Sequence, residues 1–154
     1  MCKIASLALV AALALSVEIG TAFAGETVTY RGTGTFVATR TLMPLANGGA
    51  AIHLSNQVVA TIAPSEPGFI FGDCAGLGYL SPESAYEVHV FCSFTETGND
   101  SFDIKGAGGV KGGSVEIIGG SGKWTGATGT GTFTRKWVDG PRGSFDYEFR
   151  ITTP

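Results

Sequence analysis

The sequence predicts an all-β protein, an antiparallel eight-stranded β-barrel, and two features of the chain lead to this prediction. The first is composition, because residues 25–154 contain 23 Gly and 16 Thr, and both residue types are poor helix formers. The second is periodicity, since apolar residues recur at every second position and no long stripe has the 3.6-residue period of a helix. With 154 residues, the chain is long enough for one such domain and too short for two.

The first 24 residues have the pattern of a secretory signal peptide. Lys3 is followed by 14 residues, 4–17, that are only Ile, Ala, Ser, Leu and Val, and residues 22–24 supply the small-x-small cleavage pattern. A membrane anchor is disfavoured because Glu18 interrupts the apolar run and about 20 residues are needed to span a bilayer. A lipoprotein would need a cysteine at the cleavage point, and Cys2 lies at the opposite end.

We therefore predict a signal peptide at 1–24, a single β-barrel domain at 25–154, and a secreted or periplasmic protein without membrane association after cleavage. The net charge of −3, from 10 Lys+Arg and 13 Asp+Glu, comes without a basic stripe. This charge pattern argues against a nucleic-acid partner.

Two cysteines, Cys74 and Cys92, remain in the mature chain. An even pair in an oxidising compartment is predicted to form a disulfide. A catalytic cysteine is the alternative, but neither thiol has a Cys-x-x-Cys partner or an activating neighbour in the sequence.

Strands are predicted in chain order from period-2 alternation and from turn residues. In 28–38 one face carries Val28, Tyr30, Phe36 and Ala38 with two glycines, and the other face is rich in Thr. Segments 129–137 and 145–151 alternate in the same way. Further strands are expected at 50–62, 69–80, 85–97, 101–107 and 113–118, between clusters of Gly, Pro, Asn or Asp. Eight such strands close naturally into a barrel, and a two-sheet sandwich is the alternative.

The segment Gly-Gly-Ser-Gly-Lys-Trp at 119–124 is the most distinctive in the chain. It fails the P-loop pattern because Trp124 follows Lys123 where Ser or Thr is required. Ser121 also lacks the Gly-x-Ser-x-Gly frame of a hydrolase nucleophile. We expect a tight or short helical turn through 121–127 that places Trp124 against one end of the barrel.

With its neighbours, this segment resembles the β-barrel of plant dirigent proteins and allene oxide cyclases, and more closely small secreted bacterial proteins with an allene-oxide-cyclase-like barrel. The pattern is Gly-Gly-Ser-Gly-Lys-Trp-x-x-Ala-x-Gly at 119–129, followed by a Thr/Phe-rich strand and a terminal Phe-Asp-Tyr-Glu-Phe strand. The resemblance covers mainly 113–151 and, more weakly, 84–107. It implies a calycin-like barrel in which the glycine-rich segment is structural. The catalytic residues of the plant enzymes find no match here, so catalytic positions are unknown.

Arg135 is the most informative candidate for a binding residue. It shares an otherwise apolar face with Phe133 and Trp137, and an arginine inside a barrel must find a carboxylate or an anionic ligand because it keeps its charge. Alternatively, its head group reaches water at the barrel mouth or pairs with Glu116 or Asp73. The predicted ligand-binding set is Arg135, Tyr30, Phe36, Phe133, Trp137, Tyr147, Phe149 and Glu116.

The two histidines are predicted to be structural. Glu87 and His89 lie two residues apart and share a face, an arrangement that also suits an acid–base pair. The opposite face of that strand is apolar and is the better candidate for the interior, so we expect the pair to face solvent. His53 lies on the more polar face of its strand. Because the spacing of the histidines gives no ligand signature, no metal site is expected.

Three functions fit this sequence. The first is binding of a small apolar or weakly acidic ligand inside the barrel, with Arg135 orienting its acidic group. The second, implied by the resemblance, is an isomerase-like or cyclase-like enzyme without cofactor, which guides cyclisation or coupling of a reactive intermediate by confinement. The third is a structural or protein-interaction role with a filled barrel, for which the exposed Thr faces are candidates. A homo-oligomer is possible because similar barrels form oligomers.

Overall fold

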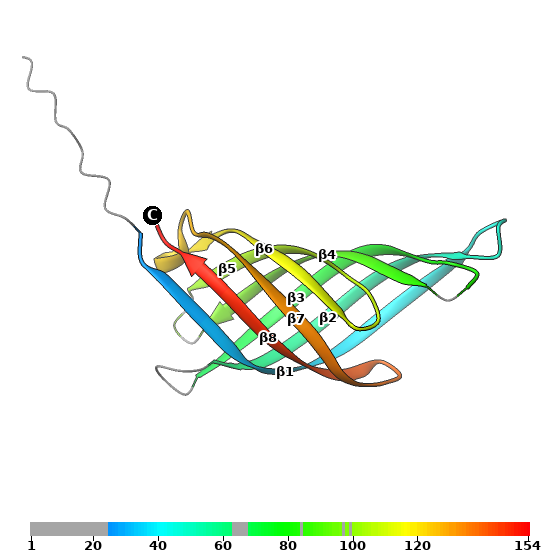
Figure 1. The fold of residues 1–154 in the computed structure, drawn as a ribbon, viewed down its shortest axis with the longest axis horizontal. Helices are drawn as coiled ribbons and strands as arrows, with labels where there is room; N and C mark the ends of the chain where they lie inside the picture. The colour runs from blue at the N-terminus through cyan, green and yellow to red at the C-terminus, as the bar shows by residue number, and fades with distance from the viewer. Residues whose placement is uncertain (1–24, 63–67, 84, 97, 99) are drawn as a thin grey trace, which may run out of the picture.

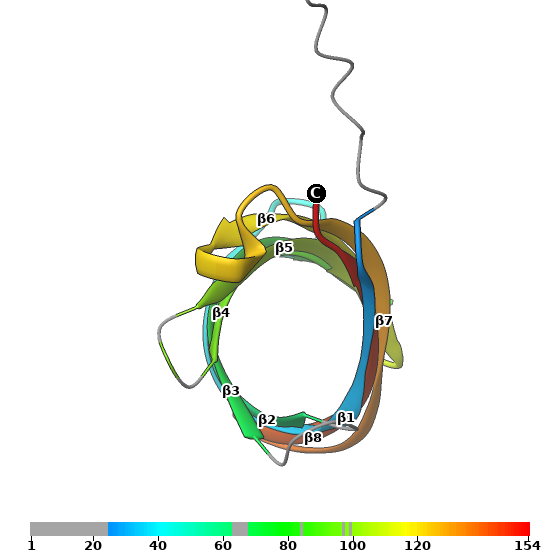
Figure 2. The same ribbon diagram turned by 90° about the vertical axis from the view of Figure 1, so that its left-hand side faces the viewer.

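The computed structural model describes residues 25–62, 68–83, 85–96, 98 and 100–154. In this part of the chain, eight antiparallel strands each pair with the next, and the last pairs with the first to close a barrel (Figures 1 and 2). The strands are β1 (Thr27–Pro44), β2 (Ala50–Ile62), β3 (Gly68–Leu80), β4 (Tyr86–Glu96), β5 (Ser101–Gly108), β6 (Gly112–Ser121), β7 (Thr128–Asp139) and β8 (Arg142–Thr152). The predicted all-β barrel is thus confirmed. The predicted signal peptide and Cys2 lie outside the described residues.

One short 3-10 helix, η1 (Gly122–Trp124), lies between β6 and β7. It starts within the glycine-rich segment and buries Trp124, which is 2% exposed. The sequence predicted this turn and this placement of the tryptophan. None of the helices among the described residues is both long and apolar enough to cross a membrane.

Strand β1 is longer than the sequence predicts, and its extra length opens one end of the barrel. Its pairing with β8 stops at Val37, whereas its pairing with β2 continues to Pro44. The hairpins β1–β2 and β3–β4 extend past the rest of the rim (Figure 1). Residues 39–44 therefore have a strand neighbour on one side only. Arg40 lies in this segment.

The interior is packed most densely in the half of the barrel next to η1. The largest fully buried side chains are Trp124, Phe102, Ile70, Ile117 and Ile151. Glycines on the inward faces make room for the aromatic rings of this core. A Cβ at Gly72, for example, would overlap the Phe94 ring. Repeated glycine on the inward face therefore serves ring packing in this half.

The disulfide predicted from the cysteine pair is present. Cys74 and Cys92 lie directly opposite each other on β3 and β4, and their sulfur atoms are bonded. Both side chains are buried and face the interior, at 6% and 7% exposure. The bond therefore joins two neighbouring strands from within the core.

The sequence prediction for Trp137 was wrong, because its side chain lies on the outer face of the barrel and not inside. Strict alternation from Phe133 and Arg135 puts Trp137 inside, but the pairing of β7 with β8 shifts register between Arg135 and Trp137. This bulge moves the indole to the outer face, where it is 53% exposed. A β-bulge inserts one extra residue and so reverses the alternation beyond it.

Candidate functional site

The two ends of the barrel differ in how their polar groups are paired. We call the end that holds η1 and both chain termini of the barrel the closed end, and the end formed by the turns β1–β2, β3–β4, β5–β6 and β7–β8 the open end (Figure 1). Figure 2 views the barrel from the closed end, with η1 at the rim.

At the closed end, the carboxylate of Glu96 accepts three hydrogen bonds. The donors are Tyr30 Oη at 3.3 Å, Trp124 Nε1 at 3.1 Å and Lys123 Nζ at 2.5 Å. The Glu96 side chain is only 9% exposed. Burying a charged carboxylate is costly unless its oxygens accept hydrogen bonds, as they do here. The Lys-Trp pair of the glycine-rich segment thus anchors η1 to the end of β4.

Backbone geometry explains the glycine that precedes this pair. Gly122 has φ of +59°, a conformation that glycine adopts with little steric cost. A Cβ at this position would also overlap the Asp100 carboxylate, which accepts a hydrogen bond from the Lys123 backbone N–H. The segment is structural, as its resemblance to the barrel family implied.

Two tyrosines belong to this closed end. Burial and the nearby Glu96 carboxylate raise the pKa of Tyr30 above its ordinary value. Burial and the same carboxylate raise the pKa of Tyr147 to about 12, and Tyr147 Oη donates to the backbone carbonyl of Thr61 at 2.6 Å. Both hydroxyls therefore stay protonated at neutral pH and serve as structural donors.

Between the closed-end core and the open end lies an interior cavity of about 90 Å³. Its wall is mainly aliphatic and aromatic, and includes Phe36, Ala38, Leu54, Val58, Val88, Phe133, Phe145 and Phe149 together with the disulfide. The half of the barrel next to η1 is thus filled, whereas the half toward the open end combines a smaller buried cluster of Ala38, Ile52, Leu54 and Val88 with this cavity. Among the residues that line it, none is a carboxylate or an imidazole.

Two arginines and a tyrosine occupy the mouth of this cavity. Arg40 from β1 and Arg135 from β7 both approach the ring of Tyr86 at the start of β4, with Cζ-to-centroid distances of 5.9 and 5.4 Å. These are cation–π distances. Neither guanidinium forms an ion pair with any carboxylate of the described residues. Two cations thus share one aromatic ring and have no described anion beside them.

Two polar atoms along the cavity also lack partners. Tyr86 Oη and Asn56 Oδ1 are buried, and neither makes a hydrogen bond within the described part of the chain. A buried polar atom without a partner costs about 1–3 kcal/mol. Among the described residues, therefore, the cavity and its mouth hold two arginines without a carboxylate partner and two buried polar atoms without a hydrogen bond.

The structure separates the predicted ligand-binding residues into three groups. Arg135, Phe36, Phe133 and Phe149 line the cavity. Tyr30 and Tyr147 face the interior but lie in the closed-end core. Trp137 and Glu116 are on the outer surface, where Glu116 pairs with Lys105 at 2.9 Å. Arg135, Glu116 and Tyr30 therefore do not converge, and neither Glu116 nor Asp73 pairs with Arg135.

Sequence reasoning missed three residues of the mouth and cavity: Arg40, Tyr86 and Asn56. For Arg40 the signal was available, because continuing the alternation of β1 one step past Ala38 reaches it. Tyr86 lies on the apolar face opposite Glu87 and His89, which the sequence favoured as the interior face, but its contact with two arginines depends on the closure of the barrel.

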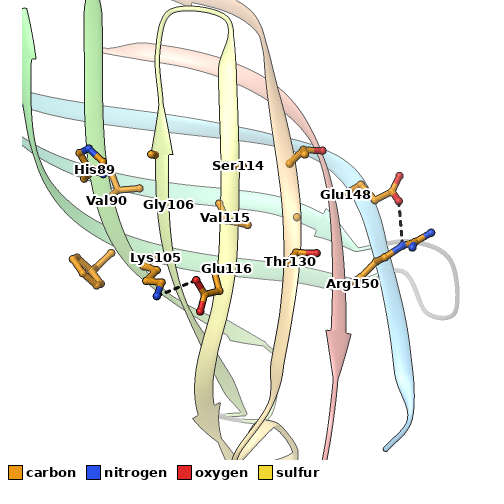
Figure 3. Close-up of a pocket in the computed structure, with 14 residues that line it drawn as sticks. His89, Val90, Lys105, Gly106, Ser114, Val115, Glu116, Thr130, Glu148 and Arg150 are labelled. Carbon is orange, nitrogen blue, oxygen red and sulfur yellow. Dashed lines mark ion pairs between the residues drawn. The ribbon is translucent and has the colours of Figure 1, made fainter.

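A larger concavity, of about 760 Å³, lies on the outer surface across β4 to β8 (Figure 3). Its floor consists of small residues such as Ala107, Ser114 and Thr130. The charges around it are already paired, Lys105 with Glu116 and Arg150 with Glu148 (Figure 3). The ion pairs around this concavity leave less uncompensated charge among the described residues than the mouth of the interior cavity does, so we take the smaller interior cavity as the candidate site.

The histidine pair lies on the same outer face. His89 Nε2 is 3.4 Å from Glu87 Oε1, and both side chains are about 70% exposed, as predicted for a solvent-facing pair. Within the described residues, no three His, Cys, Asp or Glu side chains gather in a group that could hold a metal ion.

The barrel resembles those of several solved structures. Two pterocarpan synthase dirigent proteins align with TM-scores of 0.58 and 0.61, each at 12% identity. The alignments cover 85% and 84% of this chain, and 97% and 89% of the respective dirigent chains. The barrel is dirigent-like.

A Shewanella oneidensis protein of unknown function from the DUF3224 family shares the dirigent-like architecture, with a TM-score of 0.52 and 16% identity over 82% of this chain and 99% of its own. No protein-family model matches the sequence. No curated protein matches it. At these identities the dirigent-like likeness establishes the fold alone, and function must be argued from the site.

Proposed function

We propose that this protein is an exported binding protein that holds a compact apolar ligand in the cavity at the open end of its barrel. The observation that carries the proposal is the interior cavity near the open end, which is walled by aromatic and aliphatic side chains. At its mouth lie two guanidinium groups that pair with no carboxylate of the described residues. Concave apolar sites with a few placed polar groups are the usual form of small-molecule sites.

The volume of the cavity limits the ligand. Drug-sized molecules occupy pockets of about 300 Å³ or more, whereas a buried cavity of roughly 150 Å³ accepts benzene. At about 90 Å³, this cavity is smaller than the benzene-binding one, so it takes a short branched chain or one edge of a single ring whose remainder lies in the mouth. The polar part of such a ligand then lies at the mouth, beside Arg135.

The wall chemistry favours binding over catalysis. Because the lining contains no carboxylate and no imidazole, acid–base catalysis lacks a base among these residues. Guided cyclisation or coupling, the alternative function implied by the resemblance to dirigent proteins, would depend on confinement of the substrate alone. Binding of a small ring through apolar contacts requires no catalytic acid or base.

Export is supported by the disulfide and by the predicted signal peptide. A bond between Cys74 and Cys92 is typical of proteins that fold in oxidising compartments. N-terminal sequencing of the protein recovered from an exported fraction should give Gly25 as the first residue. An intact N-terminus in the cytosolic fraction would contradict export.

Binding is tested by titrating the purified protein with toluene and p-cresol in nuclear magnetic resonance experiments. We expect shifts of methyl signals of cavity residues, and we expect Ala38→Leu to abolish them, because Ala38 is 5% exposed and lines the cavity. The matched control is Ala75→Leu, which adds the same atoms on the outer face of β3. Unshifted spectra of the wild-type protein with both compounds would reject the proposal.

A further inference from the structure

We infer that the open end of the barrel is an anion-binding mouth, and that the ligand is a monocyclic carboxylate with a hydrogen-bond donor at the opposite side of its ring. This inference rests on the proposed function, since it names the class of ligand for the same cavity. It is carried by the arginine pair and the buried atoms of Tyr86 and Asn56.

The charges at the mouth call for an anion. Arg40 and Arg135 come from strands that are separated by β8, yet both lie within 6 Å of the centre of the same Tyr86 ring. Arginine stays charged at any physiological pH, so the two cations repel each other and gain only the cation–π attraction of the ring. Elsewhere on the barrel Arg31 is paired with a carboxylate, Glu148, at 2.9 Å. At the mouth, the missing carboxylate is the one the ligand would supply.

A carboxylate is the anion that fits best. Its planar, two-oxygen geometry matches the guanidinium fork, and charge-assisted hydrogen bonds of this kind are stronger than neutral ones. Tyr86 Oη is a donor that is buried without a partner among the described residues. A carboxylate has lone pairs for two guanidinium groups and for a phenol hydroxyl as well.

The far side of the ligand is specified by Asn56. In the ladder, Arg40 pairs with Leu54 and Asn56 pairs with Ala38, so Asn56 is two residues deeper along β2. Two residues of a strand span about 7 Å, which is roughly the length of a ring with a substituent at each end. The unpartnered Oδ1 of Asn56 accepts a hydrogen bond, and a hydroxyl on the ring supplies the donor.

The probe that follows from these contacts is 4-hydroxybenzoate. Its binding to the disulfide-bonded mature protein should be measured by isothermal titration calorimetry beside three relatives, namely p-cresol, benzoate and acetate. p-Cresol keeps the ring and hydroxyl without the charge, benzoate lacks the hydroxyl, and acetate is the anion without the ring. We expect 4-hydroxybenzoate to bind on the order of tenfold or more tightly than p-cresol, because it adds charge-assisted hydrogen bonds.

Variants test separately which residues recognise the carboxylate and which recognise the hydroxyl. Arg40→Gln and Arg135→Gln should each reduce the affinity for 4-hydroxybenzoate about tenfold and leave that for p-cresol unchanged. Asn56→Leu should remove the preference for 4-hydroxybenzoate over benzoate and keep the dependence on the carboxylate. Arg142→Gln, a change of the same kind at an exposed residue at the start of β8, is the matched control, and circular dichroism verifies the fold of each variant.

The outcomes separate this inference from the proposed function. If p-cresol binds as tightly as 4-hydroxybenzoate, the barrel is a ligand-binding protein but the anion-binding mouth is wrong. If acetate binds as well as 4-hydroxybenzoate, the arginines hold an anion without the cavity, and the ring preference is wrong. If none of the four compounds binds, both the proposed function and the inference are rejected.

Discussion

At the closed end of the barrel the carboxylate of Glu96 accepts hydrogen bonds from three donors, whereas at the open end Arg40 and Arg135 approach one tyrosine ring without a carboxylate among the described residues. The closed end has a densely packed core around Trp124, and the open end contains a cavity of about 90 Å³. Both ends belong to one continuous ladder of strands.

This difference shows how one small barrel divides stability from binding. The closed end gains free energy from filled volume and satisfied polar groups. The open end gives up part of that gain, since empty volume and unpaired polar atoms are destabilising. Changes at the closed end should therefore reduce the free energy of unfolding, and changes at the open end should affect binding.

The largest expected effect comes from the tryptophan of η1. Trp124→Ala removes a side chain that is 2% exposed and should reduce the free energy of unfolding by about 3–5 kcal/mol, as measured by urea unfolding followed by circular dichroism. Trp137→Ala is the matched control because that indole is 53% exposed, and it should change stability by about 0.5 kcal/mol or less. Equal losses in the two variants would refute the division between the ends.

The disulfide should be next in size. Replacing both Cys74 and Cys92 by Ala removes a cross-link with a sequence separation of 18 residues, and such a link contributes roughly 3 kcal/mol in the chain-entropy model. Thermal unfolding of the double variant and of the chemically reduced wild type should show similarly lowered midpoints. A reduced wild-type protein with an unchanged midpoint would contradict this expectation.

Glu96→Gln should have a smaller effect. The amide oxygen can still accept from Tyr30 and Trp124, but the charge that pairs with Lys123 is lost, and hydrogen bonds to charged groups contribute about 1.5–3 kcal/mol. We therefore expect a loss of about 2 kcal/mol in urea unfolding. The control is Glu116→Gln, which removes an exposed pair with Lys105 and should cost about 1 kcal/mol or less.

The closed end should also weaken at high pH. The pKa of Tyr147 is raised from 10.0 to about 12 in the folded protein, by burial and by the charge of Glu96. Because the folded state holds this proton more tightly than the unfolded state, the contribution is fully present below pH 10 and is lost as the pH rises to about 12. Ultraviolet absorbance of tyrosinate should show a component that titrates near pH 12. Tyr147→Phe should remove this component, and Glu96→Gln should move it to lower pH. An unchanged titration in both variants would contradict the assignment.

The smallest effect on stability is expected at the open end. Arg40→Gln removes one of two like charges and should change the free energy of unfolding by about 0.5 kcal/mol or less, with a slight gain at low ionic strength. Arg31→Gln is the comparison of opposite sign, because that arginine has a carboxylate partner, Glu148. If Arg40→Gln destabilises the protein more than Arg31→Gln does, Arg40 has a structural partner at the mouth.

Much of the fold followed from the sequence because it depends on local pattern. Period-2 alternation places a side chain on the inner or outer face of a sheet without reference to distant residues. This was sufficient for six of the inward-facing aromatic residues, namely Tyr30, Phe36, Phe133, Phe145, Tyr147 and Phe149. The disulfide could be predicted from an even number of cysteines in a chain expected to fold in an oxidising compartment. The turn at Gly-Lys-Trp could be predicted because glycines, which interrupt strands, directly precede a large apolar residue.

The tertiary structure alone decided what the open end contains. Alternation cannot anticipate a bulge, and the register shift after Arg135 moved Trp137 to the outer surface. Only closure of the barrel brings Arg40, Tyr86 and Arg135 from three separate strands to one mouth. The same holds for the position of the cavity, because side-chain volumes add up across all eight strands, whereas a sequence pattern records one strand at a time.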